Sequence, residues 1–150
     1  NSEIKENFDF APEIFLVESN GDSMALTENR IYNHLITFGK EVSAAILAFL
    51  VKRDPQFVTI VGNRDENNEG QIGAVRALIK LSSVFPVDML RIKLPTLNDL
   101  SEMQEAGENL VDWHKNGAIL SKPEILDIIN KHREKFNADK LAKFLKKYEL

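Results

Sequence analysis

Acidic residues directly follow two apolar stretches of the sequence, where carboxylates could hold a metal ion. The stretches are residues 14–17 and 57–61. The residues that follow them are Glu18 and Asp22 after the first, and Asn63 and Asp65 after the second. In an extended chain, a spacing of two points side chains the same way, as it does for Asn63 and Asp65. Magnesium prefers hard oxygen ligands, so these residues predict one metal site if the two stretches are neighbouring strands.

The apolar stretches are typical of buried strands in a parallel sheet. Residues 57–61 are apolar or β-branched throughout, which indicates a strand with both faces covered. We expect strands at 13–18, 34–38, 57–62 and 89–94. We expect helices at 22–30, 42–51 and 72–81, and another from Asp99 through Ala106. This alternation predicts an α/β fold in which ligands bind at the carboxyl edge of the sheet.

The last third of the chain has a helical pattern. Ser121 to Glu124 form a capping box with Pro123 in the first turn, and Asn137 is placed to cap a final helix. We therefore divide the chain into a linker at 1–12, an α/β domain at 13–120 and a helical extension at 121–150. We expect Trp113, together with Leu110, to pack the helical part onto the sheet.

The composition limits the kinds of site that the chain can contain and the cellular location we expect for it. The chain has 150 residues and no cysteine, which excludes disulfides, zinc ribbons and thiol catalysis. No apolar run approaches the roughly 18 residues of a membrane span, and no signal-peptide pattern precedes the first predicted strand. We therefore expect a cytoplasmic protein with no membrane partner. Because Asn1 stands where a Met would begin a chain, we expect a fragment or a processed product.

Charge is distributed unevenly along the chain. Residues 1–129 hold 12 Lys or Arg against 20 Asp or Glu, whereas residues 130–150 hold 7 against 3. The acidic body is unlike a general nucleic-acid binder. The basic tail could contact phosphates, or it could be a solvated helix face.

Four segments, taken together, resemble the motifs of the Toprim family. The segments are Glu18-Ser-Asn-Gly-Asp22, His34-Leu-Ile-Thr-Phe-Gly39, Asn63-Arg-Asp-Glu-Asn-Asn-Glu-Gly70 with Ala74, and Ile92-Lys-Leu-Pro95 with Asn98 and Asp99. They occur in the family's order over residues 14–107. The chain is most similar to the Toprim domains of bacterial and phage primases.

The resemblance implies a parallel four-stranded fold that uses Mg²⁺ or Mn²⁺. It implies that Glu18 and Asp65 are catalytic, with Glu18 as the acid/base or as a metal holder. It makes Asp65 and Asp99 the metal ligands, with Asp22 in support. The implied partners are a single-stranded DNA template and nucleotides.

One position departs from the family pattern. Asn63 stands where the family has the first aspartate of its Asp-x-Asp motif. An amide offers one neutral oxygen and cannot bridge two ions as a carboxylate does. Either the site binds metal more weakly, with Glu66 or Glu69 compensating, or it has lost its chemistry.

Two basic residues are candidates for binding phosphate. Arg64 could contact a phosphate or neutralise the carboxylates around it. Lys93 lies near a predicted strand edge and could guide a nucleic acid.

Three functions remain open at this point. The first is primase-like nucleotidyl transfer, for which the zinc module of such primases is missing from this cysteine-free chain. The second is phosphodiester hydrolysis, as in Toprim nucleases. The third is a non-catalytic module whose residues 121–150 dock a helicase, another replication protein or a second copy of the chain.

Overall fold

Four parallel strands form the central sheet. The computed structural model describes residues 12–37 and 41–149. The strands are β1 (Glu13–Val17), β2 (His34–Ile36), β3 (Phe57–Val61) and β4 (Leu90–Lys93), in the order β2-β1-β3-β4. The predicted parallel sheet is therefore confirmed, with each strand within two residues of its expected ends. Phe38, Gly39 and Lys40, which the predictions also used, lie outside the described residues.

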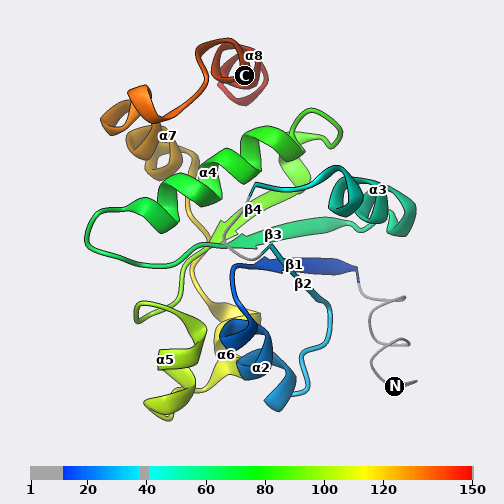
Figure 1. Cartoon of the computed structure of the whole chain (residues 1–150), viewed down its shortest axis with the longest axis vertical. Coiled ribbons are helices and arrows are strands. Elements are labelled where there is room, and N and C mark those ends of the chain that lie inside the picture. The colour runs from blue at the N-terminus through cyan, green and yellow to red at the C-terminus, as the bar shows by residue number, and fades with distance from the viewer. Residues whose placement is uncertain (1–11, 38–40, 150) are drawn as a thin grey trace.

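Helices cover both faces of the sheet (Figure 1). One face carries α3 (Ala44–Arg53), α4 (Glu69–Leu81), α7 (Lys122–Lys131) and α8 (Ala138–Tyr148); the other carries α2 (Asn20–Glu28), α5 (Leu100–Glu105) and α6 (Leu110–Asn116). Two short 3₁₀ turns, η1 (Val87–Met89) and η2 (Arg133–Lys135), precede β4 and α8. The result is a three-layer α/β fold.

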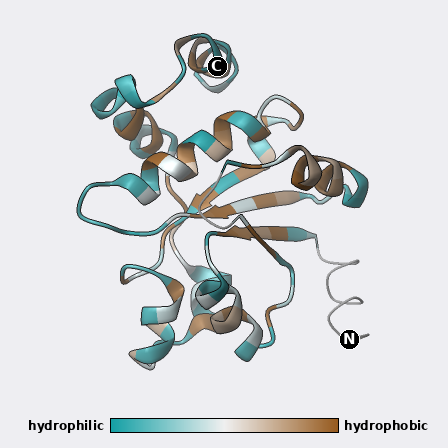
Figure 2. Cartoon of the chain, viewed as in Figure 1, coloured by the Kyte–Doolittle hydropathy of each residue, from teal (hydrophilic) through white to brown (hydrophobic). Residues whose placement is uncertain are grey.

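Alternation along the strands separates two hydrophobic cores. In β1, Ile14 and Leu16 join the core under α4, whereas Phe15 and Val17 join the core under α2. This is the period of two expected of a strand buried on both sides. Figure 2 shows largely apolar strands between helices that carry hydrophilic stretches.

The C-terminal helices are built as their sequence predicts. The Ser121–Glu124 capping box forms, and the Asn137 side chain caps α8. The apolar stripes of α7 and α8 belong to the core under α4, and their buried residues are Ile125, Ile129, Leu141, Phe144 and Tyr148. Trp113 instead packs α6 against the opposite face, where its ring lies 6.3 Å from that of Phe15. In the described parts of the chain, no helix has the length and apolar character needed to cross a membrane.

The strand order fixes where a ligand site is expected. The chain runs from β1 outward to β2 and then returns to place β3 on the other side of β1. Open α/β sheets bind ligands at such a switch point, beyond the carboxyl ends of the strands. Here the two strands that meet at the switch point are the ones followed by Glu18 and by Asn63.

Candidate metal centre

Glu18 lies at the switch point, directly after β1. Its side chain is half-buried and borders a small hollow of about 60 Å³. The hollow is also lined by Gly62 at the end of β3 and by a face of α4 that consists of Gly70, Gly73, Ala74 and Ala77.

Negative charges converge on Glu18. Burial is the largest cause that raises the pKa of Glu18 above its ordinary value of 4.5. The remaining causes are the nearby charges of three aspartates, Asp22, Asp65 and Asp99. Since like charges disfavour ionisation only when they are close, the fold has gathered the four carboxylates that the sequence singled out. We call these four residues the carboxylate cluster.

Asp65 is oriented by the first turn of α4. Its two carboxylate oxygens accept hydrogen bonds from the backbone N–H groups of Glu69 (2.8 Å) and Gly70 (2.9 Å). These are donors that a helix start leaves without an intrahelical partner, and the helix dipole favours an anion there. Asp65 therefore caps α4 while it contributes its charge to the cluster.

Asp22 and Asp99 both hold the start of α5. Asp22 is 1% exposed, and its Oδ1 accepts from the Leu100 N–H at 3.1 Å. Burial and the charge of Asp99 raise the pKa of Asp22, although hydrogen bonds to its carboxylate act in the opposite direction. Asp99 is the N-cap residue of α5 and accepts from the Glu102 N–H at 2.8 Å.

The donor atoms of the cluster suit a hard cation. They are carboxylate oxygens, to which the amide of Asn63, two residues before Asp65, could add one more, and such oxygens are what Mg²⁺ and Mn²⁺ prefer. As arranged, however, no three acidic, histidine or cysteine side chains among the described residues are grouped tightly enough to hold one ion. The structure thus shows carboxylates that converge within range of one another's charge, without a closed ligand set.

Close backbone packing explains the glycine and alanine of the third motif. A Cβ on Gly70 would lie 2.8 Å from both the backbone nitrogen and the carbonyl carbon of Asn63. A Cβ on Gly62 would lie 2.9 Å from the Gly70 oxygen and 3.0 Å from the Ala74 Cβ. Small residues at these positions let α4 start directly against the end of β3, which brings Asp65 within range for its charge to raise the pKa of Glu18.

Arg64 joins the two loops that carry Asp65 and Asp99. Its Nε donates to the Pro95 oxygen at 2.9 Å, and its backbone N–H donates to the Asn98 oxygen at 2.8 Å. The residue is exposed. These bonds support a role for Arg64 in positioning the loops, and its predicted contact with phosphate stays a prediction.

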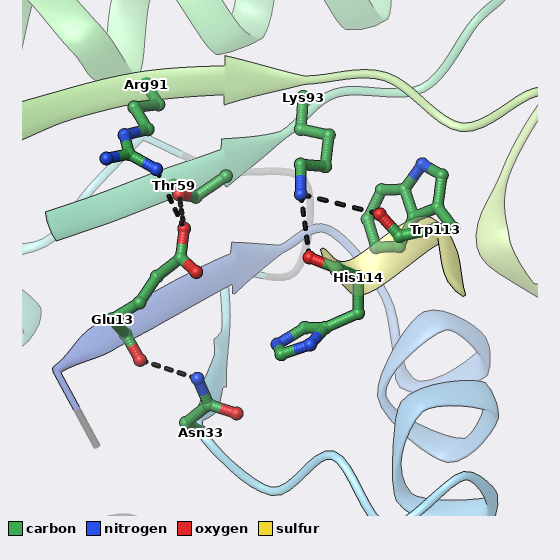
Figure 3. Close-up of polar contacts among 7 residues, drawn as sticks. All are labelled: Glu13, Asn33, Thr59, Arg91, Lys93, Trp113 and His114. Carbon is green, nitrogen blue, oxygen red and sulfur yellow. Dashed lines mark hydrogen bonds and ion pairs between the residues drawn. The ribbon is translucent and has the colours of Figure 1, made fainter. Parts of the chain in front are cut away.

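Lys93 lies inside the protein. It is 3% exposed, and its Nζ donates to the backbone oxygens of His114 (2.9 Å) and Trp113 (3.4 Å), as Figure 3 shows. Burial is the main cause that lowers the pKa of Lys93. It points to the face that α6 covers, whereas Glu18 borders α4. This placement supports a structural role for Lys93 in fixing α6.

A polar row on the same face was not anticipated. The Glu13 carboxylate accepts from the Thr59 hydroxyl and lies 4.0 Å from the Arg91 guanidinium (Figure 3). That guanidinium stacks 3.5 Å above the centre of the Phe57 ring. The signal was available in the sequence, because Arg91 and Lys93 alternate with apolar residues and so must share one face of β4.

Comparisons with known proteins place this fold. No protein-family model matches the chain, and no curated protein matches it. Solved structures of primases do match. A DNA primase domain from Pseudomonas aeruginosa is 18% identical with a TM-score of 0.62, and the match covers 99% of this chain and 54% of that one. The E. coli primase catalytic core is 17% identical with a TM-score of 0.64, covering 84% and 40%. A DnaG primase catalytic domain bound to ssDNA is 16% identical with a TM-score of 0.65, covering 95% and 46%.

The chain thus spans about half the length of these primase structures, or less. Identities this low show a shared fold. The resemblance to the Toprim domains of bacterial primases is confirmed at that level.

Proposed function

We propose that this chain is the catalytic domain of a primase-like, metal-dependent nucleotidyltransferase in DNA replication. The observation that carries the proposal is the carboxylate cluster at the switch point of a sheet whose fold is that of primase catalytic cores. A clustered set of perturbed carboxylates in such a position is a physical reason to expect a functional site.

The proposed cofactor is Mg²⁺, or Mn²⁺ in its place. Glu18, Asp65 and Asp99 would hold it, Asp22 would support them from α2, and Asn63 would add one neutral oxygen. When bound, such ions stabilise the negative charge of a phosphoryl group in transfer. Without cations, the carboxylates repel one another, which is the effect that already acts on Glu18.

Glu18 is suited to handle a proton. In the proposed reaction, the 3′-hydroxyl of a primer attacks the α-phosphate of a nucleotide paired with single-stranded DNA, and pyrophosphate leaves. Glu18 would accept the proton of the attacking hydroxyl. In the metal-free protein, burial and the charges of the three aspartates raise the pKa of Glu18, and a base with a raised pKa holds a transferred proton more firmly.

A primer-synthesis assay on single-stranded DNA tests the proposal. We expect Mg²⁺-dependent synthesis by the wild-type chain and a loss of about 10²-fold or more in Glu18→Gln. Glu105→Gln, an exposed position at the end of α5, is the control and should keep full activity. Equal synthesis by wild type and Glu18→Gln would contradict the proposal. Cleavage of the template in the same assay, without synthesis, would favour the nuclease.

A second candidate is a non-catalytic module, and two observations favour it. Asn63 removes one family carboxylate, and three aspartates of the cluster already cap helices. The apolar stripes of α7 and α8 are buried in the core, so a helicase or other partner would meet their charged outer faces. Calorimetry separates the candidates: no heat of binding at millimolar Mg²⁺ or Mn²⁺ would favour the module.

A further inference from the structure

A basic groove runs between α4 and α8. Its volume is about 690 Å³, and its walls include the start of α8 and the segment before it. The cationic residues that line it are Arg76 and Lys80 on α4, and Lys135, Lys140, Lys143 and Lys147 on the C-terminal segment. Among the described residues that line it, Glu41 is the one acid. Figure 1 shows the two helices that form its walls.

Helical spacing aims these cations inward. Lys140, Lys143 and Lys147 recur at intervals of three and four, which places them on one side of α8. Lys146, on the same helix, does not line the groove, and neither do the acids of residues 130–149, which are Glu134, Asp139 and Glu149. A solvated helix face needs no such segregation. A cleft lined by one sign of charge concentrates its field on an oppositely charged ligand.

Arg76 and Lys147 make hydrogen bonds that join the two sides of the groove. Arg76 donates through Nε and Nη2 to the Lys135 oxygen at 3.1 and 2.6 Å, and Lys147 Nζ donates to the Ser82 oxygen at 2.9 Å. Lys140 and Lys143 take part in no ion pair within the described ranges. The same holds for the side chains of Lys80 and Lys135, so these four lysines have charge to offer a ligand.

The residues that line the groove also indicate which part of a ligand they could contact. Phe136 and Phe144 are 9% and 1% exposed, so neither ring offers a free face for stacking a base. Recognition would rest on charge, as in sequence-independent binding of a phosphate backbone. Pockets of about 300–1,000 Å³ hold drug-sized ligands, a size that suits a short stretch of one strand better than a duplex.

The groove leads to the carboxylate cluster. Gly73 and Ala77 of α4 line both the groove and the hollow beside Glu18. Nothing lies within 4 Å of a Cβ built on Gly73, so the helix surface between the two is open. A strand held in the groove would run along α4 toward Glu18.

We propose that this basic groove binds the phosphate backbone of single-stranded nucleic acid and directs the strand to the carboxylate cluster. The second half of this statement rests on the proposed function, whereas the binding itself does not.

Binding is measured by fluorescence anisotropy with a labelled oligothymidylate of about 12 nucleotides, in EDTA and without nucleotides. We expect Lys143→Glu to weaken binding about tenfold or more and to make the salt dependence shallower by about one phosphate contact. Lys146→Glu is the matched control: the same change of charge on the same helix, outside the groove, with an effect below about twofold. The assay contains neither metal nor nucleotide, so a failure of catalysis leaves this result intact.

A steric variant tests the groove without changing charge. Gly73→Leu places a side chain in open space on α4, and we expect it to weaken oligothymidylate binding while the helix stays folded by circular dichroism. The proposal is overturned if Lys143→Glu and Lys146→Glu weaken binding equally, or if neither Lys143→Glu nor Gly73→Leu affects it. Tighter binding of a duplex, or of polyglutamate through Lys143, would also overturn it, since the occupant would then be of another class.

Discussion

Burial and the charges of neighbouring aspartates act in the same direction on the carboxyl group of Glu18. Both raise its pKa from an ordinary value of 4.5. Above that value an unfolded chain has already released the carboxyl proton, whereas the folded chain retains it to higher pH. The folded state therefore loses stability as pH rises from 4.5 through the raised pKa. The charge of this residue at neutral pH opposes folding, which is common at sites shaped for function.

Replacing Glu18 by Gln should remove this loss. In EDTA, we expect Glu18→Gln to be more stable than wild type at pH 7, and the difference to vanish near pH 4, where the wild-type carboxyl is protonated. Urea unfolding across this pH range measures it, with exposed Glu105→Gln as the control. A stability difference that does not change with pH would show that the carboxylate charge is not its cause.

Asn63→Asp should strengthen metal binding. One additional carboxylate beside the cluster brings a full negative charge to a divalent cation, and such a charge commonly contributes about 1–3 kcal/mol, or roughly tenfold or more in affinity. Titration of both proteins with Mn²⁺ measures the change. Unchanged affinity would mean that residue 63 does not face the metal.

At the residue scale, the sequence singled out the four residues of the carboxylate cluster but did not show how their side chains are held. Glu18 and Asp65 were found because each follows an apolar strand. That Asp65 caps α4 depends on how closely the helix approaches β3, which no local pattern reveals. Lys93 was expected near a strand edge where it could meet a nucleic acid. Its burial follows from α6, a helix of only seven residues that was not predicted to cover that face.

Among the elements, the junction between β3 and α4 positions most of the site. We predict that Gly70→Ala destabilises the protein by about 1–3 kcal/mol, because the new methyl would collide with the Asn63 backbone. Gly73→Ala, three residues along the same helix, is the matched control and should stabilise by about 0.5–1 kcal/mol, since its Cβ meets nothing. Chemical denaturation gives both values. Equal effects of the two variants would contradict the close approach of α4 to β3.

The elements themselves were largely predictable. Apolar runs closed by glycine or proline located the strands, because such runs bury both faces and such residues end them. The start of α4 was placed too late, at residue 72 instead of Glu69. Its N-cap residue, Asn68, makes no side-chain cap. The cap comes from Asp65, which a search for the usual signals at the helix start does not find.

At the scale of the whole molecule, the C-terminal helices α7 and α8 pack into the same hydrophobic core as one face of the sheet. Phe144 of α8 is 1% exposed and belongs to the hydrophobic core that also contains residues of β1 and β3. We predict that Phe144→Ala lowers the free energy of unfolding by about 3–5 kcal/mol in a single transition. Val111→Ala, at a position that is 40% exposed, should cost far less. A separate early transition that involves only the helices would show that residues 121–150 fold independently.

The basic groove is a property of the whole molecule, because residues from distant parts of the chain form it. The sequence showed that residues 130–150 are basic, and a solvated helix face explained them equally well. The proposal of phosphate binding depends on α8 lying across from Arg76 and Lys80, more than fifty residues earlier in the chain. Such a juxtaposition depends on tertiary packing and cannot be read from the tail alone.

The central claim is that the carboxylate cluster is a divalent-metal site, and a calorimetric titration with Mn²⁺ tests it most directly. At pH 7 and low salt we expect saturable binding by the wild-type chain, weakened about tenfold or more in Glu18→Gln and unchanged in Glu105→Gln. The wild-type affinity should fall as pH is lowered through the raised pKa of Glu18, since protons compete with the ion. Wild-type binding that Glu18→Gln leaves intact, or no binding at millimolar Mn²⁺, would contradict the claim.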